Sequence, residues 1–279
     1  MIIMGFMDDI KNLTVCGGEL AISWLGQNSY IFKTPRGTLI AVDPYLSRIP
    51  PEGVEVEEYF VHPEPPVKPE DFRVDYVFCT HDHSDHTDPI TLSAIAKHSP
   101  RTIFFGTPES YRHFLRAGIP KDRARSLRDG ETIEVGDFKV SALSSIIGCE
   151  RDGRGRKWTT HYGYIFDFGF VKVYNMGDSS PEVVADPTTV LGRVANFSPE
   201  IAILPIIGDF PGRRPEDAVK FAKIIKPKIV IPSHYGCFKR RTIDPKAFAE
   251  LLEGTPDIKP VIIDYMGVYI YRETQPIRQ

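Results

Sequence analysis

The sequence has little cysteine and lacks long apolar runs. Its four cysteines, Cys16, Cys79, Cys149 and Cys237, lie far apart and form no CxxC pair. This spacing argues against a cysteine zinc site and against a disulfide framework, and it favours a reducing compartment, so we expect a cytoplasmic protein. The opening MIIMGFM is apolar but short, and no basic residue precedes it. We therefore expect neither a signal peptide nor a membrane-spanning helix.

The chain also lacks an excess of positive charge. Its net charge is −3 over 279 residues, with 42% hydrophobic and 25% charged residues. These values are typical of a globular protein and give no global reason to expect nucleic-acid binding. No internal repeat and no low-complexity segment stands out, and we expect a single domain over residues 1–279.

Strand patterns dominate the first third of the chain. The segments ELAISWL, NSYIFKT, GTLIAVDP and VDYVFCT are rich in β-branched and aromatic residues and are separated by turn residues. Asp88-Pro89 then has the form of an N-cap followed by proline at the first helical position. From about residue 181, helices and strands alternate. Strands mixed with helices in both halves predict a layered α/β domain with the sheets inside the helices.

The segment THDHSDH, residues 80–86, holds three of the eight histidines of the chain. On extended backbone, His81 and His83 point the same way, and a turn would direct Asp85 and His86 to a neighbouring point. Imidazole and carboxylate are the usual ligands of zinc, and of iron or manganese with more oxygen. The alternative is a solvated polar loop between a strand and a helix.

A metal site would need further ligands from distant parts of the chain. Asp178 follows VYNMG, His234 follows IVIPS, and His161 begins HYGYIF. Each stands where a predicted strand meets a loop, which is where the sites of α/β proteins are usually built.

THDHSDH, GDSS and IPSHYG, in this order, resemble the metallo-β-lactamase superfamily. The segment from Ile22 to Ser47, which contains Asp43-Pro44, is similar to the N-terminal strands of that family. HYGCFKRRTIDPKAF is most similar to the ascorbate-6-phosphate lactonase-like branch of metal-dependent hydrolases. The resemblance spans roughly residues 20–272.

This resemblance implies a four-layer αββα sandwich with one or two divalent metal ions at one edge. Zinc is the expected metal, with manganese or iron as alternatives. By motif position, His81 and His83 would bind the first metal, Asp85, His86 and His234 the second, and Asp178 would bridge them. Asp43 would orient ligands from behind.

One position departs from the family pattern. Relatives usually supply a third histidine to the first metal near the position of Ile147. His161 is the nearest histidine and could substitute, because two histidines alone make a poor zinc site. The alternatives are that His161 is structural or faces the substrate, or that the enzyme uses a single metal.

The expected chemistry is hydrolysis by a metal-bound hydroxide. Asp85 would bind metal and steer or accept a proton. Tyr235 would donate a hydrogen bond to a developing oxyanion, or else be a packed aromatic. The sequence allows a homo-oligomer but does not fix the oligomeric state.

Basic residues in three loops, 151–157, 213–214 and 239–241, suggest a cationic rim for a small anionic substrate, such as a phosphorylated lactone or ester. Arg213 and Lys239 are the candidate contacts. The alternatives are a phosphodiesterase or nuclease, an iron redox enzyme, and a metal-binding protein without catalysis. No appended nucleic-acid-binding module is apparent in the sequence, so we do not expect a nucleic-acid substrate.

Overall fold

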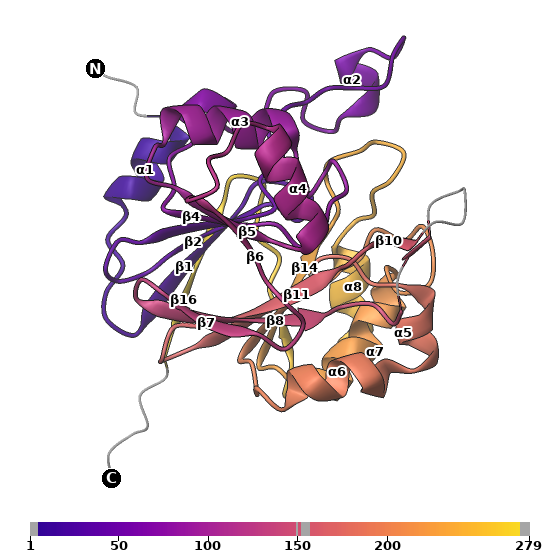
Figure 1. Cartoon of the computed structure of the whole chain (residues 1–279). Helices are drawn as coiled ribbons and strands as arrows, with labels where there is room; N and C mark the ends of the chain where they lie inside the picture. The colour runs from indigo at the N-terminus through magenta and orange to yellow at the C-terminus, as the bar shows by residue number, and fades with distance from the viewer. Residues whose placement is uncertain (1–4, 149, 152–156, 274–279) are drawn as a thin grey trace.

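The computed structural model describes residues 5–148, 150–151 and 157–273. Two seven-stranded mixed sheets face each other, and each is covered on its outer face by helices (Figure 1). The predicted four-layer αββα sandwich is therefore confirmed. No helix in the described part of the chain has the length and apolarity that crossing a membrane requires.

The first sheet is antiparallel on one side and parallel on the other, with the order β16-β1-β2-β3-β4-β5-β6. Its strands are β1 (Glu19–Trp24), β2 (Tyr30–Lys33), β3 (Leu39–Val42), β4 (Tyr76–Phe78), β5 (Ile103–Gly106), β6 (Ala124–Ser126) and β16 (Val268–Arg272).

The second sheet has the order β15-β14-β13-β12-β11-β8-β7 and is parallel from β15 to β12. Its strands are β7 (Thr132–Val135), β8 (Phe138–Ser144), β11 (Tyr162–Asp167), β12 (Lys172–Asn175), β13 (Ile201–Pro205), β14 (Ile229–Ser233) and β15 (Lys259–Pro260). A separate pair, β9 (Glu150–Arg151) and β10 (Lys157–Thr159), precedes β11.

Helices form the two outer layers. The first layer holds α1 (Phe6–Asn12), α3 (Pro89–His98) and α4 (Pro108–Arg116), and the second holds α5 (Pro181–Ala185), α6 (Pro187–Ala195), α7 (Pro215–Ile225) and α8 (Lys246–Leu251). The short helix α2 (Val56–Tyr59) and the 3₁₀ turn η1 (Pro69–Asp71) belong to the connection between β3 and β4, where α2 projects from the body (Figure 1).

Alternation along the strands explains why both faces of the first sheet are buried. On β4, Phe78 points between the sheets, where its ring lies 5.2 Å from that of Phe166, whereas Val77 faces the helical layer. Phe32 and Ile31 on β2 divide in the same way. Strands buried on both faces read as continuous apolar runs, as these do.

The predicted start of α3 is also found. The Asp88 carboxylate accepts a hydrogen bond from the Ile90 amide at 3.1 Å, and Pro89 is the first helical residue. This cap ends the histidine-rich segment two residues after His86, so the segment stays a short loop held between β4 and α3.

Candidate metal centre

The candidate site lies at one edge of the sandwich, where strands of both sheets end. Asp43 follows β3, residues 80–86 follow β4, Asp178 follows β12 and His234 follows β14. Parallel strands present their carboxyl ends at the same edge, and β3–β4 and β12–β13–β14 are parallel. His161 precedes β11, which is antiparallel to β12, so it reaches this edge from the opposite chain direction.

One group of ligand-type atoms consists of three imidazoles. A nitrogen atom from each of His81, His83 and His161 lies within 4.8 Å of the others. His81 Nε2 is 2.9 Å from His83 Nδ1, and the His161 ring stacks on that of His81 with centroids 3.9 Å apart. The structure thus groups His161 with His81 and His83, while Ile147 packs at the margin of the core. The role of His161 as a metal ligand stays a prediction.

A second group combines two imidazoles with a carboxylate. Atoms of Asp85, His86 and His234 lie within 4.8 Å of one another, and the Nε2 atoms of the two histidines are 3.0 Å apart. Asp85 Oδ2 is 3.6 Å from His86 Nε2 and 3.8 Å from His234 Nε2.

Asp178 lies between the two groups and is buried. Its Oδ1 atom is 2.8 Å from His234 Nε2, and its Oδ2 atom is 3.6 Å from His81 Nε2. A carboxylate with one oxygen toward each group has the geometry of a bridge. Its approach is possible because Gly177 has no side chain: a Cβ there would lie 2.7 Å from Thr80 Cβ.

Asp43 lies behind His86 and receives four hydrogen-bond contacts. His86 Nδ1 lies 2.6 Å from its Oδ2, and Thr80 donates from its amide at 2.7 Å and from its hydroxyl at 2.6 Å. Asn28 Nδ2 donates at 2.7 Å. With Nδ1 directed at Asp43, Nε2 of His86 faces the cluster, which is how metal-binding imidazoles are commonly oriented.

Sequence reasoning missed two amide side chains from the turn between β1 and β2. Gln27 Nε2 donates to Asp85 Oδ2 at 2.7 Å, and Asn28 supports Asp43. The segment GQNS has the composition of an ordinary turn, so nothing in it marked a contact with residues far along the chain. Gln27 and His234 both have positive φ, 54° and 63°, in a region that non-glycine residues occupy at a cost of about 1–3 kcal/mol.

The ionisation states suit a metal. Burial, and then the nearby imidazoles of His161 and His86, lower the pKa of His81 well below its usual value. Burial also lowers the pKa of His83. Burial alone would raise the pKa of Asp178, but Arg213 and His234 outweigh it and hold that pKa well below the usual range. Neutral imidazoles and ionised carboxylates are the forms that bind cations, so this donor set fits zinc, manganese or iron.

His86 behaves differently in the metal-free protein. Burial opposes its charge, but Asp85 and Asp43 outweigh burial, and the pKa of His86 rises to about 9. Because the folded-state pKa exceeds the unfolded value of about 6.5, this pairing stabilises fully below pH ~6.5 and is lost as pH rises through about 9.

Chelator-treated protein should therefore lose roughly 3 kcal/mol of unfolding free energy between pH 6.5 and 9, since one pKa unit corresponds to about 1.4 kcal/mol. Urea denaturation across this range measures how the unfolding free energy changes with pH, and this pH dependence should be weaker in a His86→Gln variant. An equal pH dependence in the variant would rule out His86 as its source.

Metal uptake at pH 7.5 should release a proton, measurable as a buffer-dependent binding enthalpy.

Two other predicted site residues are held by contacts of their own. The ring of Tyr235 stacks on that of Trp24 with centroids 4.5 Å apart, and burial, followed by the charges of Asp264 and Asp244, raises its pKa. Lys239 is exposed and donates to the Glu57 carbonyl at 2.5 Å. The role of Tyr235 as an oxyanion donor and that of Lys239 as a substrate contact remain predictions.

The two remaining basic loops differ in what the structure describes. Arg213 is 6% exposed and its Nη1 lies 2.6 Å from Asp178 Oδ2, so it lies inside the centre and not on a rim. Cys149 and residues 152–156, with the side chains of Arg151 and Lys157, lie outside the described residues.

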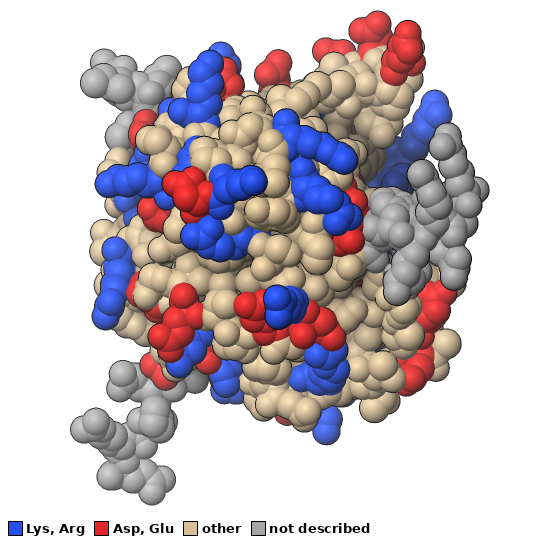
Figure 2. Space-filling model, viewed as in Figure 1, with Lys and Arg blue, Asp and Glu red and all other residues tan. Residues whose placement is uncertain are grey.

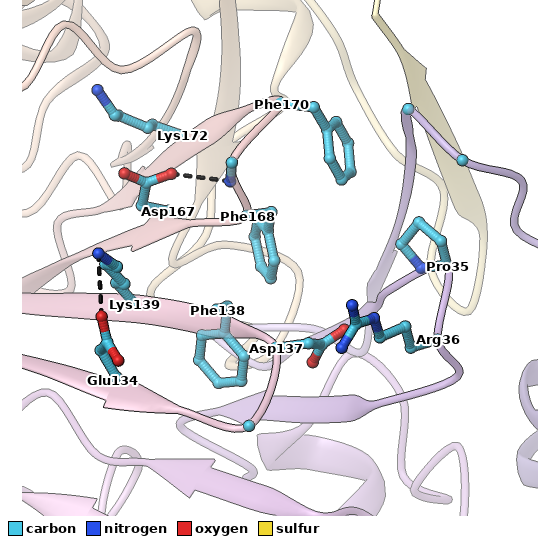
Figure 3. Close-up of a pocket in the computed structure, with 14 residues that line it drawn as sticks. Pro35, Arg36, Glu134, Asp137, Phe138, Lys139, Asp167, Phe168, Phe170 and Lys172 are labelled. Atoms are coloured by element: carbon cyan, nitrogen blue, oxygen red, sulfur yellow. Dashed lines mark hydrogen bonds and ion pairs between the residues drawn. The ribbon is translucent and has the colours of Figure 1, made fainter.

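A pocket of about 770 Å³ lies at the opposite ends of β8, β11 and β12 from the cluster (Figure 3). Its charged lining is largely satisfied: Lys139 pairs with Glu134 at 3.0 Å, and Asp167 accepts the Gly169 amide at 2.8 Å. None of its lining residues belongs to the cluster. The histidine and aspartate groups are therefore separate from this pocket.

Two mixed sheets packed between helical layers, with this cluster at one edge, define the metallo-β-lactamase fold. Residues 21–234 match the family described as the beta-lactamase superfamily domain. The chain belongs to this family.

Relatives of known name and structure agree with this assignment. The chain is 28% identical over 247 residues to a UPF0173 metal-dependent hydrolase of Methanosarcina mazei, covering 88% of this chain and 96% of that one. It is similar in fold to Igni18, a metallo hydrolase from Ignicoccus hospitalis, with a TM-score of 0.67, 20% identity, and 91% and 99% of the two chains covered. It is also similar to CmlA, a diiron β-hydroxylase from Streptomyces venezuelae, with a TM-score of 0.59, 19% identity, and 91% and 54% covered.

Proposed function

We propose that this protein is a metal-dependent hydrolase whose centre is formed by the two ligand groups joined by Asp178. The observation that carries the proposal is that seven histidine and aspartate side chains from four strand ends converge into three overlapping groups, each with donor atoms within 4.8 Å. The name of the relative from M. mazei supports a hydrolase. The packing of the two sheets brings His234, which follows β14 of the second sheet, next to His86, which follows β4 of the first.

Each ligand has a defined place in this proposal. The imidazoles of His81, His83 and His161 would hold one divalent cation, and Asp85, His86 and His234 would hold the other. Asp178 would contact both. When bound, such cations polarise a substrate oxygen and lower the pKa of water toward neutrality.

The protein groups supply orientation and proton handling. Asp85 is half-buried, it accepts the Gln27 amide at 2.7 Å, and its pKa lies below the usual value because His86 and His234 outweigh the effect of burial. An ionised carboxylate at the open side of the cluster would accept a proton from the attacking water and pass it to the leaving group.

For the substrate, we propose a small anionic lactone or ester, such as a phosphorylated one. Support comes from the guanidinium of Arg213 inside the centre and from Lys239, Arg240 and Arg241 close after His234. On the face seen in Figure 2, basic and acidic side chains alternate and form no continuous basic tract. That distribution disfavours a nucleic-acid polymer on this face.

A substrate panel tests the choice. Metal-loaded protein should hydrolyse a phosphorylated lactone or ester faster than its neutral analogue, and added salt should reduce the difference. An Asp178→Asn variant serves as the inactive control.

Hydrolysis of phosphodiesters but not of lactones or esters would favour the phosphodiesterase alternative. Oxygen consumption with iron would favour a redox enzyme, since the fold also carries a diiron β-hydroxylase. Bound metal without turnover on any substrate would favour a non-catalytic protein.

A further inference from the structure

We propose that Arg213 places a fixed positive charge beside the first metal position, so that the centre holds one divalent cation tightly and a second one weakly. The tight position would be that of Asp85, His86 and His234, and the weak one that of His81, His83 and His161. This inference rests on the proposed function, because it assigns different strengths to the two halves of the same centre.

The two oxygens of Asp178 have different partners. Oδ2, the oxygen 3.6 Å from His81 Nε2, is also 2.6 Å from Arg213 Nη1. Oδ1, the oxygen 2.8 Å from His234 Nε2, lies 3.8 Å from His86 Nε2. The charge of the bridging carboxylate is thus already neutralised on the side of the first position and remains available on the side of the second.

The remaining donors strengthen this asymmetry. Three imidazoles are a sufficient donor set for zinc, and among the described residues no carboxylate belongs to this group, so the first position has ligands but no negative charge of its own. The second position has the carboxylate of Asp85, and Asp43 supports His86 from behind at 2.6 Å. A cation at the first position would therefore be repelled by the guanidinium of Arg213. Fewer negative charges surround it there than at the second position to offset that repulsion.

Arg213 is built into the structure and is not a surface side chain that has folded inward. Its guanidinium carbon lies 3.9 Å from the ring centroid of Phe210, and its carbonyl accepts the Gly208 amide at 2.6 Å. At Gly212, φ is +97° and a Cβ would lie 2.6 Å from the Ser180 carbonyl oxygen. Asp217 accepts the Gly212 amide at 2.8 Å. The loop between β13 and α7 is therefore pressed against the segment that follows Asp178, and this fixes where the guanidinium lies.

Metal titration of the full chain tests the inference without relying on activity. Chelator-treated protein would be titrated with Mn²⁺ alone by equilibrium dialysis, and bound metal counted by elemental analysis. We expect wild type to bind the second equivalent at least about 10-fold more weakly than the first, given the repulsion between nearby like charges. Arg213→Gln should bring the two affinities together, so that two equivalents bind at concentrations where wild type binds one.

Two further variants control for charge and position. Arg213→Lys keeps the positive charge and should keep the weak second step. Arg214→Gln removes the exposed neighbouring charge and should titrate as wild type. Thermal melts of all variants show whether each is folded, and two equal steps in the wild-type isotherm would overturn the inference even if Arg213→Gln is not.

The outcomes separate this inference from the proposed function. Two equal steps in wild type, or an Arg213→Gln variant that binds no more than wild type, would overturn the inference while leaving a metal centre in place. Loss of both metals in Arg213→Gln would also overturn it, because Arg213 would then support Asp178 for both positions. Wild-type protein that binds no metal would overturn the proposed function itself.

Discussion

Replacing His86 with alanine will remove the tightly bound metal and reduce hydrolysis by more than about 100-fold. The imidazole is fully buried and faces two partners: Nε2 lies 3.0 Å from His234 Nε2, and Nδ1 lies 2.6 Å from Asp43. Loss of a residue that only orients a metal ligand typically reduces metal affinity or activity by roughly 10–100-fold. Loss of a ligand itself should reduce them further. Elemental analysis and turnover, measured on the same preparation, check that metal and activity fall together.

His98→Ala is the matched control, because His98 is an exposed residue at the end of α3. It should keep both metal and activity. A His86→Ala protein that stayed folded, with full metal content and full turnover, would remove His86 from the centre.

Replacing Asp43 with asparagine should weaken both the metal site and the fold. Its carboxylate receives the Thr80 amide and hydroxyl, Asn28 and His86, all at 2.6–2.7 Å and all buried. The amide of asparagine cannot accept from all of these donors, and breaking a buried charged pair typically costs about 3–5 kcal/mol. We expect a loss of that order in unfolding free energy and a loss of about 10–100-fold in metal affinity.

Asp137→Asn provides the comparison for this variant. Asp137 lines the pocket at the other end of the sandwich, and its carboxylate accepts one side-chain hydrogen bond, from Thr34 at 2.7 Å. It should lose less than about 1.5 kcal/mol and bind metal as wild type does. Asp43→Asn with wild-type metal affinity would mean that the carboxylate serves folding alone.

The fold was predictable because its signals are local. Runs such as GTLIAVDP and VDYVFCT alternate between two buried faces, and Asp88-Pro89 marks the start of α3. The elements that were missed carry weak signals: β6 is a three-residue edge strand, Ala124–Ser126, with two exposed residues, and α1 is only seven residues long. Their conformations depend on what they pack against and not on a period of their own.

The candidate site likewise contains residues with clear local signals in the sequence and residues without them. His81, His83, Asp85 and His86 form one compact motif, and Asp178 and His234 each end a clear strand, so all were visible in the sequence. The neighbours of Asp178 were not. The sequence places Arg213 in a basic loop, and only the close approach of Gly212 to Ser180 turns that loop inward. Gln27 and Asn28 were hidden for the same reason, because a turn between two strands gives no sign of which distant loop it will meet.

Locating a bound cation where Asp85, His86 and His234 converge is the most direct test of the proposed metal centre. Crystals of metal-loaded protein, measured at the absorption edge of the bound metal, would locate it by anomalous scattering. We predict a peak about 2.0–2.2 Å from the Nε2 atoms of His86 and His234, if the metal is zinc, with Asp178 in contact. No peak at this edge of the sandwich in metal-loaded crystals, or a peak only elsewhere on the molecule, would contradict the proposed metal centre.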